Sequence, residues 1–137
     1  MGGKRLPISD IINLYCSRHE QRYGLRTSFF KKWFLKNQNF ATLFYRKASN
    51  AVTFYLRIDN RPAAFMSGLW CRDRLIIPRL SINEDFRRYS PGMILACESI
   101  KYLISHTSIR ILDLSQGEEK YKYNLGGKVH YSYKFKI

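Results

Sequence analysis

The chain has 137 residues, of which 45% are hydrophobic and 25% are charged. A chain of this length forms one domain around one core, and these proportions exclude intrinsic disorder and a coiled coil. Its 24 Lys and Arg residues outnumber 10 Asp and Glu residues, which gives a formal net charge of +14. Such a charge favours anionic partners, namely phosphorylated cofactors, nucleic acid or anionic lipid, although a generally basic surface explains it equally well.

The sequence shows neither a membrane-spanning run nor a secretory signal. No segment approaches the ~18 apolar residues that span a bilayer, and the N-terminus lacks the apolar core of a signal peptide. A soluble cytoplasmic protein is therefore expected. Three cysteines, Cys16, Cys71 and Cys97, are odd in number and lie in apolar contexts. They predict buried thiols and no metal site.

The first 50 residues are predicted to be helical and carry most of the charge, with ten basic and two acidic residues giving +8. Helical periodicity predicts an amphipathic helix from Ser9, as its N-cap, to Gly24, and a short second helix over residues 29–35. Residues 40–48 fit a helix better than a strand.

Residues 51–80 are predicted to form an antiparallel meander of three strands. Apolar and polar residues alternate from Val52 to Ile58, turn residues follow at 59–62, and residues 63–71 and 75–80 form the next two strands. Gly68 either marks a bulge or is tolerated at an entropic cost, which is the simpler account. Pro78 indicates an edge, a bulge or a strand end.

The last third is predicted to contain a helix, a parallel strand, a short helix and a closing strand. Ser90 is a candidate N-cap, and Pro91 suits the first position of a helix that ends near His106. The expected buried stripe of this helix comprises Met93, Ala96, Cys97, Ile100, Leu103 and Ile104. Residues 109–114 follow a helical crossover and are expected to lie parallel to the strand before it. One or two helical turns over 118–125 end at Gly126-Gly127, and residues 129–137 alternate as a strand.

The start of the long helix has the features of an anion-binding site. Ser90-Pro91-Gly92 offers free backbone N–H groups, the positive end of a helix dipole and a glycine that permits close approach. Arg87 and Arg88 add positive charge just upstream. An ordinary capped helix with solvated arginines is the alternative interpretation.

Four segments, taken in order, resemble one superfamily. They are His19-x-x-Arg22-Tyr23, Asp59 to Ala64, Phe86 to Gly92, and Asp113-Leu114-x-x-Gly117-x-x-x-Tyr121-Lys122. This series resembles the GNAT acyltransferases. More narrowly, it is similar to the C-terminal acetyltransferase domain of the branch associated with cellulose and other exopolysaccharide biosynthesis, which is distantly related to Fem-type peptidyl transferases. The resemblance extends over residues 9–135.

The resemblance implies a single α/β domain over residues 1–137 with a GNAT-like mixed sheet, a helical lead in 1–50 and the cofactor half in 51–137. It implies transfer of an acetyl or other acyl group from acyl-coenzyme A to an amine or hydroxyl, a sugar or cell-envelope precursor being one candidate acceptor. Contacts to the donor would come from Arg87, Arg88, Ser90, Pro91, Gly92, Met93 and Gly117.

Acyl transfer requires a base for the acceptor, a stabilised oxyanion and a proton for the departing thiolate. The resemblance implies that Tyr121 protonates the thiolate and that Lys122 polarises the acyl carbonyl. Asp113 would act as a base or hold its turn, and the structural role is favoured. Glu118 and Glu119 are expected to cap the short helix.

Two departures leave other functions open. Of the glycines in the Arg/Gln-x-x-Gly-x-Gly/Ala phosphate loop, Gly92 alone remains, and nothing strand-like precedes the first predicted helix. The chain could thus be a truncated or C-terminal part of a larger protein, or could need an oligomeric partner or a complementing N-terminal half. The alternatives are an inactive GNAT remnant and a basic module that binds nucleic acid through Lys31, Lys32 and Lys36.

Overall fold

A computed structural model of the chain describes residues 7, 9–14 and 49–136. Its elements are, in chain order, β1 (Ala51–Ile58), β2 (Arg61–Cys71), β3 (Arg74–Ile82), the 3-10 helix η1 (Glu84–Tyr89), α4 (Pro91–His106), β4 (Ile111–Asp113) and α5 (Lys120–Asn124). The helices expected over 29–35 and 40–48, with their lysines, and the thiol of Cys16 lie outside the described residues. The predicted mixed α/β class is confirmed.

Residues 9–14 are helical, but Ser9 does not have its predicted place. Ser9 lies within the helix, because the amides of Asp10 and Ile11 both donate to the carbonyl of Pro7, at 3.0 and 3.3 Å. The predicted N-cap is therefore wrong by two residues.

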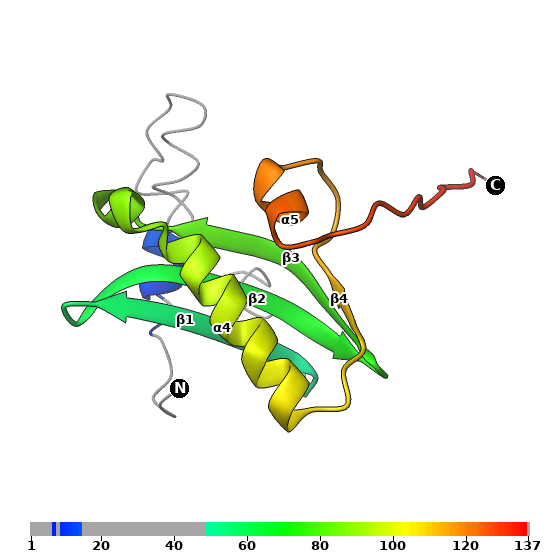
Figure 1. The fold of residues 1–137 in the computed structure, drawn as a ribbon, viewed down its shortest axis with the longest axis horizontal. Coiled ribbons are helices and arrows are strands. Elements are labelled where there is room, and N and C mark those ends of the chain that lie inside the picture. Colours follow the sequence, from blue (N-terminus) through cyan, green and yellow to red (C-terminus); the bar gives the residue numbers. More distant parts are fainter. Residues whose placement is uncertain (1–6, 8, 15–48, 137) are drawn as a thin grey trace.

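The four strands form one sheet in the order β1-β2-β3-β4 (Figure 1). The first three are antiparallel and β4 runs parallel to β3, as the helical crossover predicted. Asp59 and Asn60 make the β1–β2 turn with φ angles of 48° and 61°. Asp and Asn tolerate this left-handed conformation, so the chain reverses within two residues and Ile58 already pairs with Arg61.

A bulge interrupts the pairing of β2 with β3. Ser67 pairs with Arg79 but Leu69 pairs with Ile76, so Gly68 alone faces two residues of β3. A Cβ atom on Gly68 would lie 2.0 Å from the carbonyl oxygen of Ile76, which only glycine permits. Pro78 is one of the two residues that face Gly68, at a place where a missing N–H costs no ladder bond. The bulge, and not the simpler entropic account, explains Gly68.

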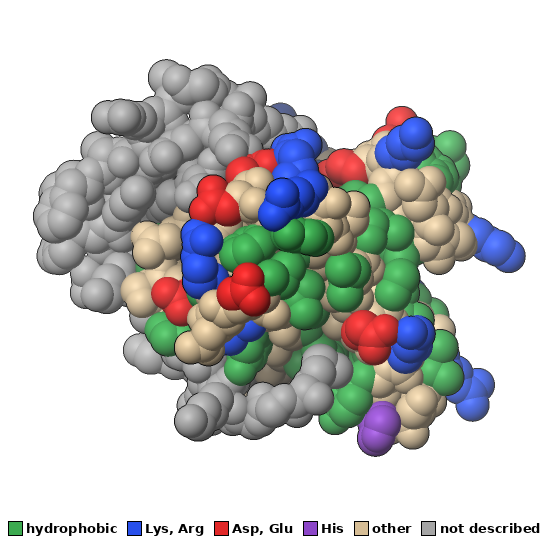
Figure 2. All heavy atoms as spheres, turned by 60° about the vertical axis from the view of Figure 1, so that its left-hand side comes forward, with side chains coloured by type: hydrophobic (Ala, Val, Ile, Leu, Met, Phe, Trp, Pro, Cys, Tyr) green, Lys and Arg blue, Asp and Glu red, His purple; other side chains and the backbone are tan. Residues whose placement is uncertain are grey.

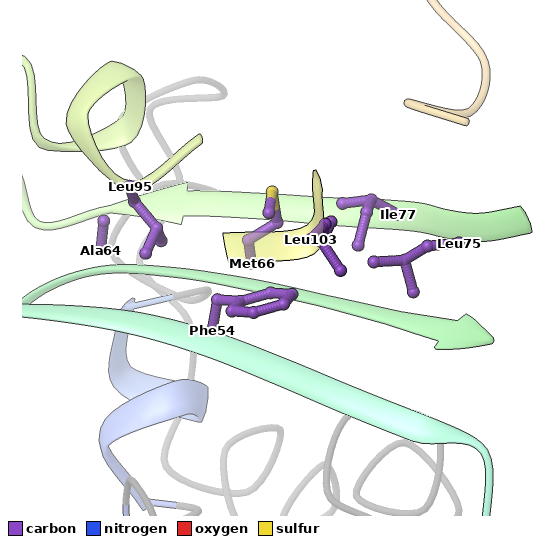
Figure 3. Packing of buried hydrophobic residues seen from close by; sticks show 7 residues of the cluster. All are labelled: Phe54, Ala64, Met66, Leu75, Ile77, Leu95 and Leu103. Atoms are coloured by element: carbon purple, nitrogen blue, oxygen red, sulfur yellow. The ribbon is translucent and has the colours of Figure 1, made fainter. Parts of the chain in front are cut away.

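The hydrophobic core lies between the sheet and α4. It comprises Phe54, Ala64, Met66, Leu75, Ile77, Leu95 and Leu103 (Figure 3). The helix of residues 9–14 lies on the other side of the sheet, where Ile11, Ile12 and Leu14 are buried (Figures 1 and 3).

The buried face of α4 differs from the predicted stripe. Leu95 and Ser99 are buried, whereas Cys97 is exposed and Ile104 has 75% of its surface exposed. One residue subtends about 100° of a helix, so Cys97 and Ile104 each turn away from their buried neighbours Ala96 and Leu103. Cys71 is exposed too. The prediction of buried thiols is thus wrong for both described cysteines.

The predicted closing strand does not form within residues 129–136. These residues pair with no strand of the described chain, and they leave the body of the molecule (Figure 1). Exposure of the alternating apolar side chains ranges from 55% at Val129 to 88% at Phe135. Alternation predicts which side chains would share a face, but a strand also needs a hydrogen-bonded neighbour.

Candidate functional site

A pocket of about 360 Å³ lies where β3 ends and α4 begins. Its lining residues are Leu80, Ile82, Glu84, Arg87, Ser90, Pro91, Gly92, Met93 and Tyr121. We call it the α4 pocket. Figure 2 turns the left-hand side of Figure 1 toward the reader. Hydrophobic side chains gather near the centre of this view, with acidic and basic groups between them. The pocket joins two segments that were predicted separately, the start of α4 and the short helix α5.

Asn83 fixes the path of the chain from β3 into the pocket. Its backbone amide donates to the carbonyl of Ala63 at 2.8 Å, and its side-chain amide donates to the carbonyl of Pro62 at 3.1 Å. Its side-chain oxygen accepts from the amide of Asp85 at 3.1 Å and caps η1. Because Phe86 is buried as well, η1 is held against the start of β2.

Arg87 lines the pocket as an ion pair. Its guanidinium donates two hydrogen bonds to the carboxylate of Glu84, one of them 2.9 Å long. Glu84 raises the pKa of Arg87, mainly through these hydrogen bonds and also through its negative charge. Arg88 lies outside the lining, where it donates to the hydroxyl of Tyr89 at 2.6 Å. The predicted positive charge at this site is thus partly neutralised by Glu84.

Ser90 precedes α4 in an unusual conformation, with φ 50° and ψ 51°. It holds the predicted N-cap position, but its side chain makes no cap hydrogen bond. Its carbonyl instead accepts from the amides of Met93 and Ile94, at 3.0 and 3.2 Å. Pro91 has no N–H, so the first free amide is that of Gly92, which no carbonyl of the helix can reach.

Gly92 lets the start of α4 pack directly on the end of β3. A Cβ atom at this position would lie 3.1 Å from Cγ2 of Ile82 and 3.3 Å from Cδ2 of Leu80. A side chain there would push against the apolar wall of the pocket. The glycine, which is buried, therefore serves close packing.

Asp113, the last residue of β4, holds the turn that follows. Its carboxylate accepts from the guanidinium of Arg74 at 3.1 Å and from the amide of Ser115 at 2.8 Å. His130 approaches the same carboxylate at 3.7 Å. Asp113 is not among the residues that line the α4 pocket.

Lys122 is buried, although Tyr121 beside it lines the pocket. Its ammonium nitrogen donates to the carbonyls of Ser115, Gln116 and Gly117, at 3.2, 2.7 and 3.2 Å. It also lies 2.8 Å from the carboxylate of Glu119. Neither Lys122 nor Gly117, whose φ is 105°, belongs to the pocket lining.

Comparison with protein families shows which family has this fold. The model of the family described as acetyltransferase (GNAT) domain matches residues 8–123. The chain belongs to the GNAT acetyltransferase family. No curated protein sequence matches it.

Solved structures share the fold of this GNAT domain. The alignment with a possible acetyltransferase from Clostridium difficile 630 covers 98% of this chain and 95% of that protein's chain, with 13% identity and a TM-score of 0.66. An integron cassette protein of V. cholerae aligns over 94% and 86%, with 13% identity and a TM-score of 0.68. The ribosomal-protein-S18-alanine N-acetyltransferase of Escherichia coli aligns over 75% of this chain, at 19% identity and a TM-score of 0.48, and the chain spans 58% of its length. The first two structures, with TM-scores of 0.66 and 0.68 at 13% identity, show a common fold and nothing narrower.

The site of this GNAT domain was only partly predictable. The structure brings Tyr121 together with Arg87 and residues 90–93, but it leaves Arg88, Asp113, Gly117 and Lys122 outside the lining. Leu80, Ile82 and Glu84 were missed, although the first two belong to the apolar alternation of β3. Within the described part of the chain, no group of His, Cys, Asp or Glu could hold a metal ion, and no helix is long and apolar enough to cross a membrane.

Proposed function

We propose that this GNAT domain transfers an acyl group from acyl-coenzyme A, with acetyl-coenzyme A as the first donor to test, to an amine or hydroxyl acceptor. The observation that carries the proposal is the α4 pocket, which the start of a 16-residue helix and a tyrosine from α5 line together. The first feature suits the phosphates of the donor, and the second suits its sulfur.

The start of α4 fits a phosphate group. The free amide of Gly92 and the positive end of the helix dipole both favour an anion. Ser90 adds a hydroxyl that is not used in capping, and Arg87 adds a guanidinium that an anion could share with Glu84. Donor contacts by Arg88 and Gly117 stay predictions, because neither residue lines the pocket.

The walls of the pocket fit the uncharged part of the donor. Leu80, Ile82 and Met93 present apolar side chains between the helix start and Tyr121. Apolar walls exclude water and lower the local dielectric constant, which strengthens the interactions of any charge that develops there.

In the proposed reaction, the acceptor nitrogen or oxygen forms a bond to the acyl carbon and gives up its proton to water, and the carbon–sulfur bond breaks. Tyr121 has a hydroxyl that can supply the proton to the departing sulfur. The contacts of Asp113 with Arg74 and Ser115 favour a role in holding the turn. Carbonyl polarisation by Lys122 stays a prediction. The contacts of its ammonium group with the loop before α5 favour a structural role instead.

The acceptor class rests on the sequence motifs. The series from His19 to Lys122 resembles the exopolysaccharide branch, so we propose amino sugars and other cell-envelope precursors as the first acceptors to test. A panel of amino sugars, peptides with free N-termini and polyamines, assayed for thiol release from acetyl-coenzyme A, would rank these classes.

Calorimetric titration with acetyl-coenzyme A tests donor binding, and Met93 offers a matched pair of variants. Met93→Glu places a negative charge in the first turn of α4, where it favours the helix but repels phosphate. Met93→Gln has the same shape without the charge. We expect Met93→Glu to bind about fivefold more weakly than Met93→Gln, since a like charge ~6 Å away costs about 1 kcal/mol in this environment. A folded wild-type protein that binds no donor up to millimolar concentration would refute the proposal.

A further inference from the structure

We propose that Lys122 is a positioning residue, and that its buried ammonium group holds α5 and thereby sets the place of Tyr121 in the pocket. The inference rests on the proposed function only for what Tyr121 does. The structural part concerns how a helix of five residues is fixed to the domain.

The helix α5 has no fully buried apolar side chain. A helix of five residues is too short to be stable in isolation. Of the side chains in α5, only that of Lys122 is buried. Glu119, at the N-cap position, makes no side-chain cap bond. The helix is closed at its other end, where Gly126 donates to Tyr123 and Gly127 donates to Lys122, each at 2.9 Å. Contacts of Lys122 must therefore supply the link between α5 and the loop before it.

The loop before α5 is shaped to receive a cation. Successive carbonyls of an extended chain point in opposite directions. The left-handed conformations of Ser115 and Gly117, with φ angles of 61° and 105°, turn three successive carbonyls toward one point. The ammonium nitrogen of Lys122 occupies that point, with the carboxylate of Glu119 beside it as counter-ion.

This arrangement uses the whole donor capacity of the lysine. An ammonium group has three N–H donors, and three carbonyls accept from it. Only 11% of the side chain is exposed. Reaching an acyl carbonyl would require the ammonium to leave all three carbonyls and the carboxylate of Glu119. The geometry favours a lysine that stays in place.

Tyr121 and Lys122 are neighbours on α5 and face different surroundings. Tyr121 lines the α4 pocket, whereas Lys122 donates to carbonyls of the loop between β4 and α5. Since adjacent helical residues project about 100° apart, fixing one side chain fixes the direction of the other. Releasing Lys122 would therefore displace the phenol from the pocket without touching the start of α4.

Amide hydrogen exchange on the full chain tests the structural part, with Lys122→Met as the variant and Lys120→Met as its control. Lys120 lies on the same helix and is exposed. We expect the amides of Leu125, Gly126 and Gly127 to exchange at least about tenfold faster in Lys122→Met, with those of the central strands unchanged. Lys120→Met should exchange like the wild type. Unchanged protection in Lys122→Met would overturn the proposal, whether or not the protein proves to be an enzyme.

Turnover then separates positioning from carbonyl polarisation. We expect Lys122→Met to lower kcat while leaving the Kd of acetyl-coenzyme A within about twofold, since the start of α4 stays intact. In a Tyr121→Phe background, the same substitution should cost nothing further, because the residue that it positions is already lost. Methylammonium should restore part of the activity of Lys122→Ala. Additive losses from Lys122→Met and Tyr121→Phe would show an independent chemical role and overturn the positioning role.

Discussion

Arg87 and Glu84 form a two-bond ion pair within the lining of the α4 pocket. The side chain of Glu84 is 15% exposed and that of Arg87 is 71% exposed, so the carboxylate is the fixed partner and the guanidinium is the accessible one. Exposed ion pairs contribute little to stability, because water screens them and two long side chains must be ordered. An incoming phosphate can therefore draw Arg87 away from Glu84 at little cost.

Replacing Glu84 with Gln should strengthen donor binding. The change removes a negative charge from the pocket and frees Arg87, so we expect the Kd of acetyl-coenzyme A to fall about threefold to tenfold at low salt. Calorimetry at two ionic strengths checks this, because the gain should shrink as salt is added. Glu98→Gln is the control, since Glu98 pairs with Lys101 through a similar contact three residues away. Weaker binding by Glu84→Gln would instead give the carboxylate a direct role in the site.

Ser90→Gly should stabilise the domain. A side chain in the left-handed region destabilises the folded chain by roughly 1–2 kcal/mol, and glycine removes this strain. Glycine also raises the entropy of the unfolded chain, which offsets about 0.5–1 kcal/mol of the gain. We expect a net gain of about 0.5–1 kcal/mol in the free energy of unfolding, measured in urea. Ser90→Ala should change little, because the hydroxyl makes no cap bond. A loss of about 1 kcal/mol in Ser90→Ala would show that the hydroxyl does cap α4 in solution.

Gly68→Ala should be among the most damaging small substitutions. The new methyl group would lie 2.0 Å from the carbonyl oxygen of Ile76, so the two strands must separate. We expect a loss of about 3 kcal/mol or more in the free energy of unfolding. Gly126→Ala is the comparison, because that position has open space and only a positive φ of 81°. Its loss should be about 1 kcal/mol. Equal losses in urea denaturation would contradict the tight strand contact.

Tyr121→Phe should lower kcat about a hundredfold and leave the Kd of the donor unchanged, because it removes only a proton donor. Steady-state kinetics and calorimetry measure the two effects separately. Tyr123→Phe is the matched control, since Tyr123 is 48% exposed and lies outside the pocket lining. A Tyr121→Phe protein with full turnover would remove this hydroxyl from the mechanism.

Asp113→Asn distinguishes a structural residue from a general base. Asn can still accept from the amide of Ser115 but loses its charge toward Arg74, so we expect a modest loss of stability, about 0.5–1 kcal/mol. The kcat of the variant should fall less than about tenfold, whereas removing a general base costs roughly a factor of 100 to 10,000. A fall in that larger range, with stability unchanged, would make Asp113 the base.

Local signals predicted the elements well. Asp59-Asn60 marked a turn and Pro91 a helix start, because each residue constrains its own backbone. The crossover helix fixed the direction of β4, since a parallel strand needs such a connection. These features depend on a few neighbouring residues.

The predictions that failed concern features that depend on tertiary contacts. The alternation in 129–136 could not show that no strand lies beside it, and the apolar character of Cys97 could not show which side of α4 meets the sheet. Glu84 was missed for the same reason, because nothing in the sequence around this acidic residue indicates that it lines a pocket. The contacts of Lys122 were not predictable either, because three of its partners are backbone carbonyls.

The bulge opposite Gly68 acts on the pocket from a distance by changing the parity of β3. Before it, the odd-numbered Leu75 and Ile77 face α4; after it, the even-numbered Leu80 and Ile82 do. In an unbroken strand, strict alternation would carry Arg79 and Ser81 to that face instead. If β3 paired regularly along its whole length, without the bulge, the apolar wall of the pocket would thus become a cationic and hydroxylated one, with every lining side chain still present in the sequence.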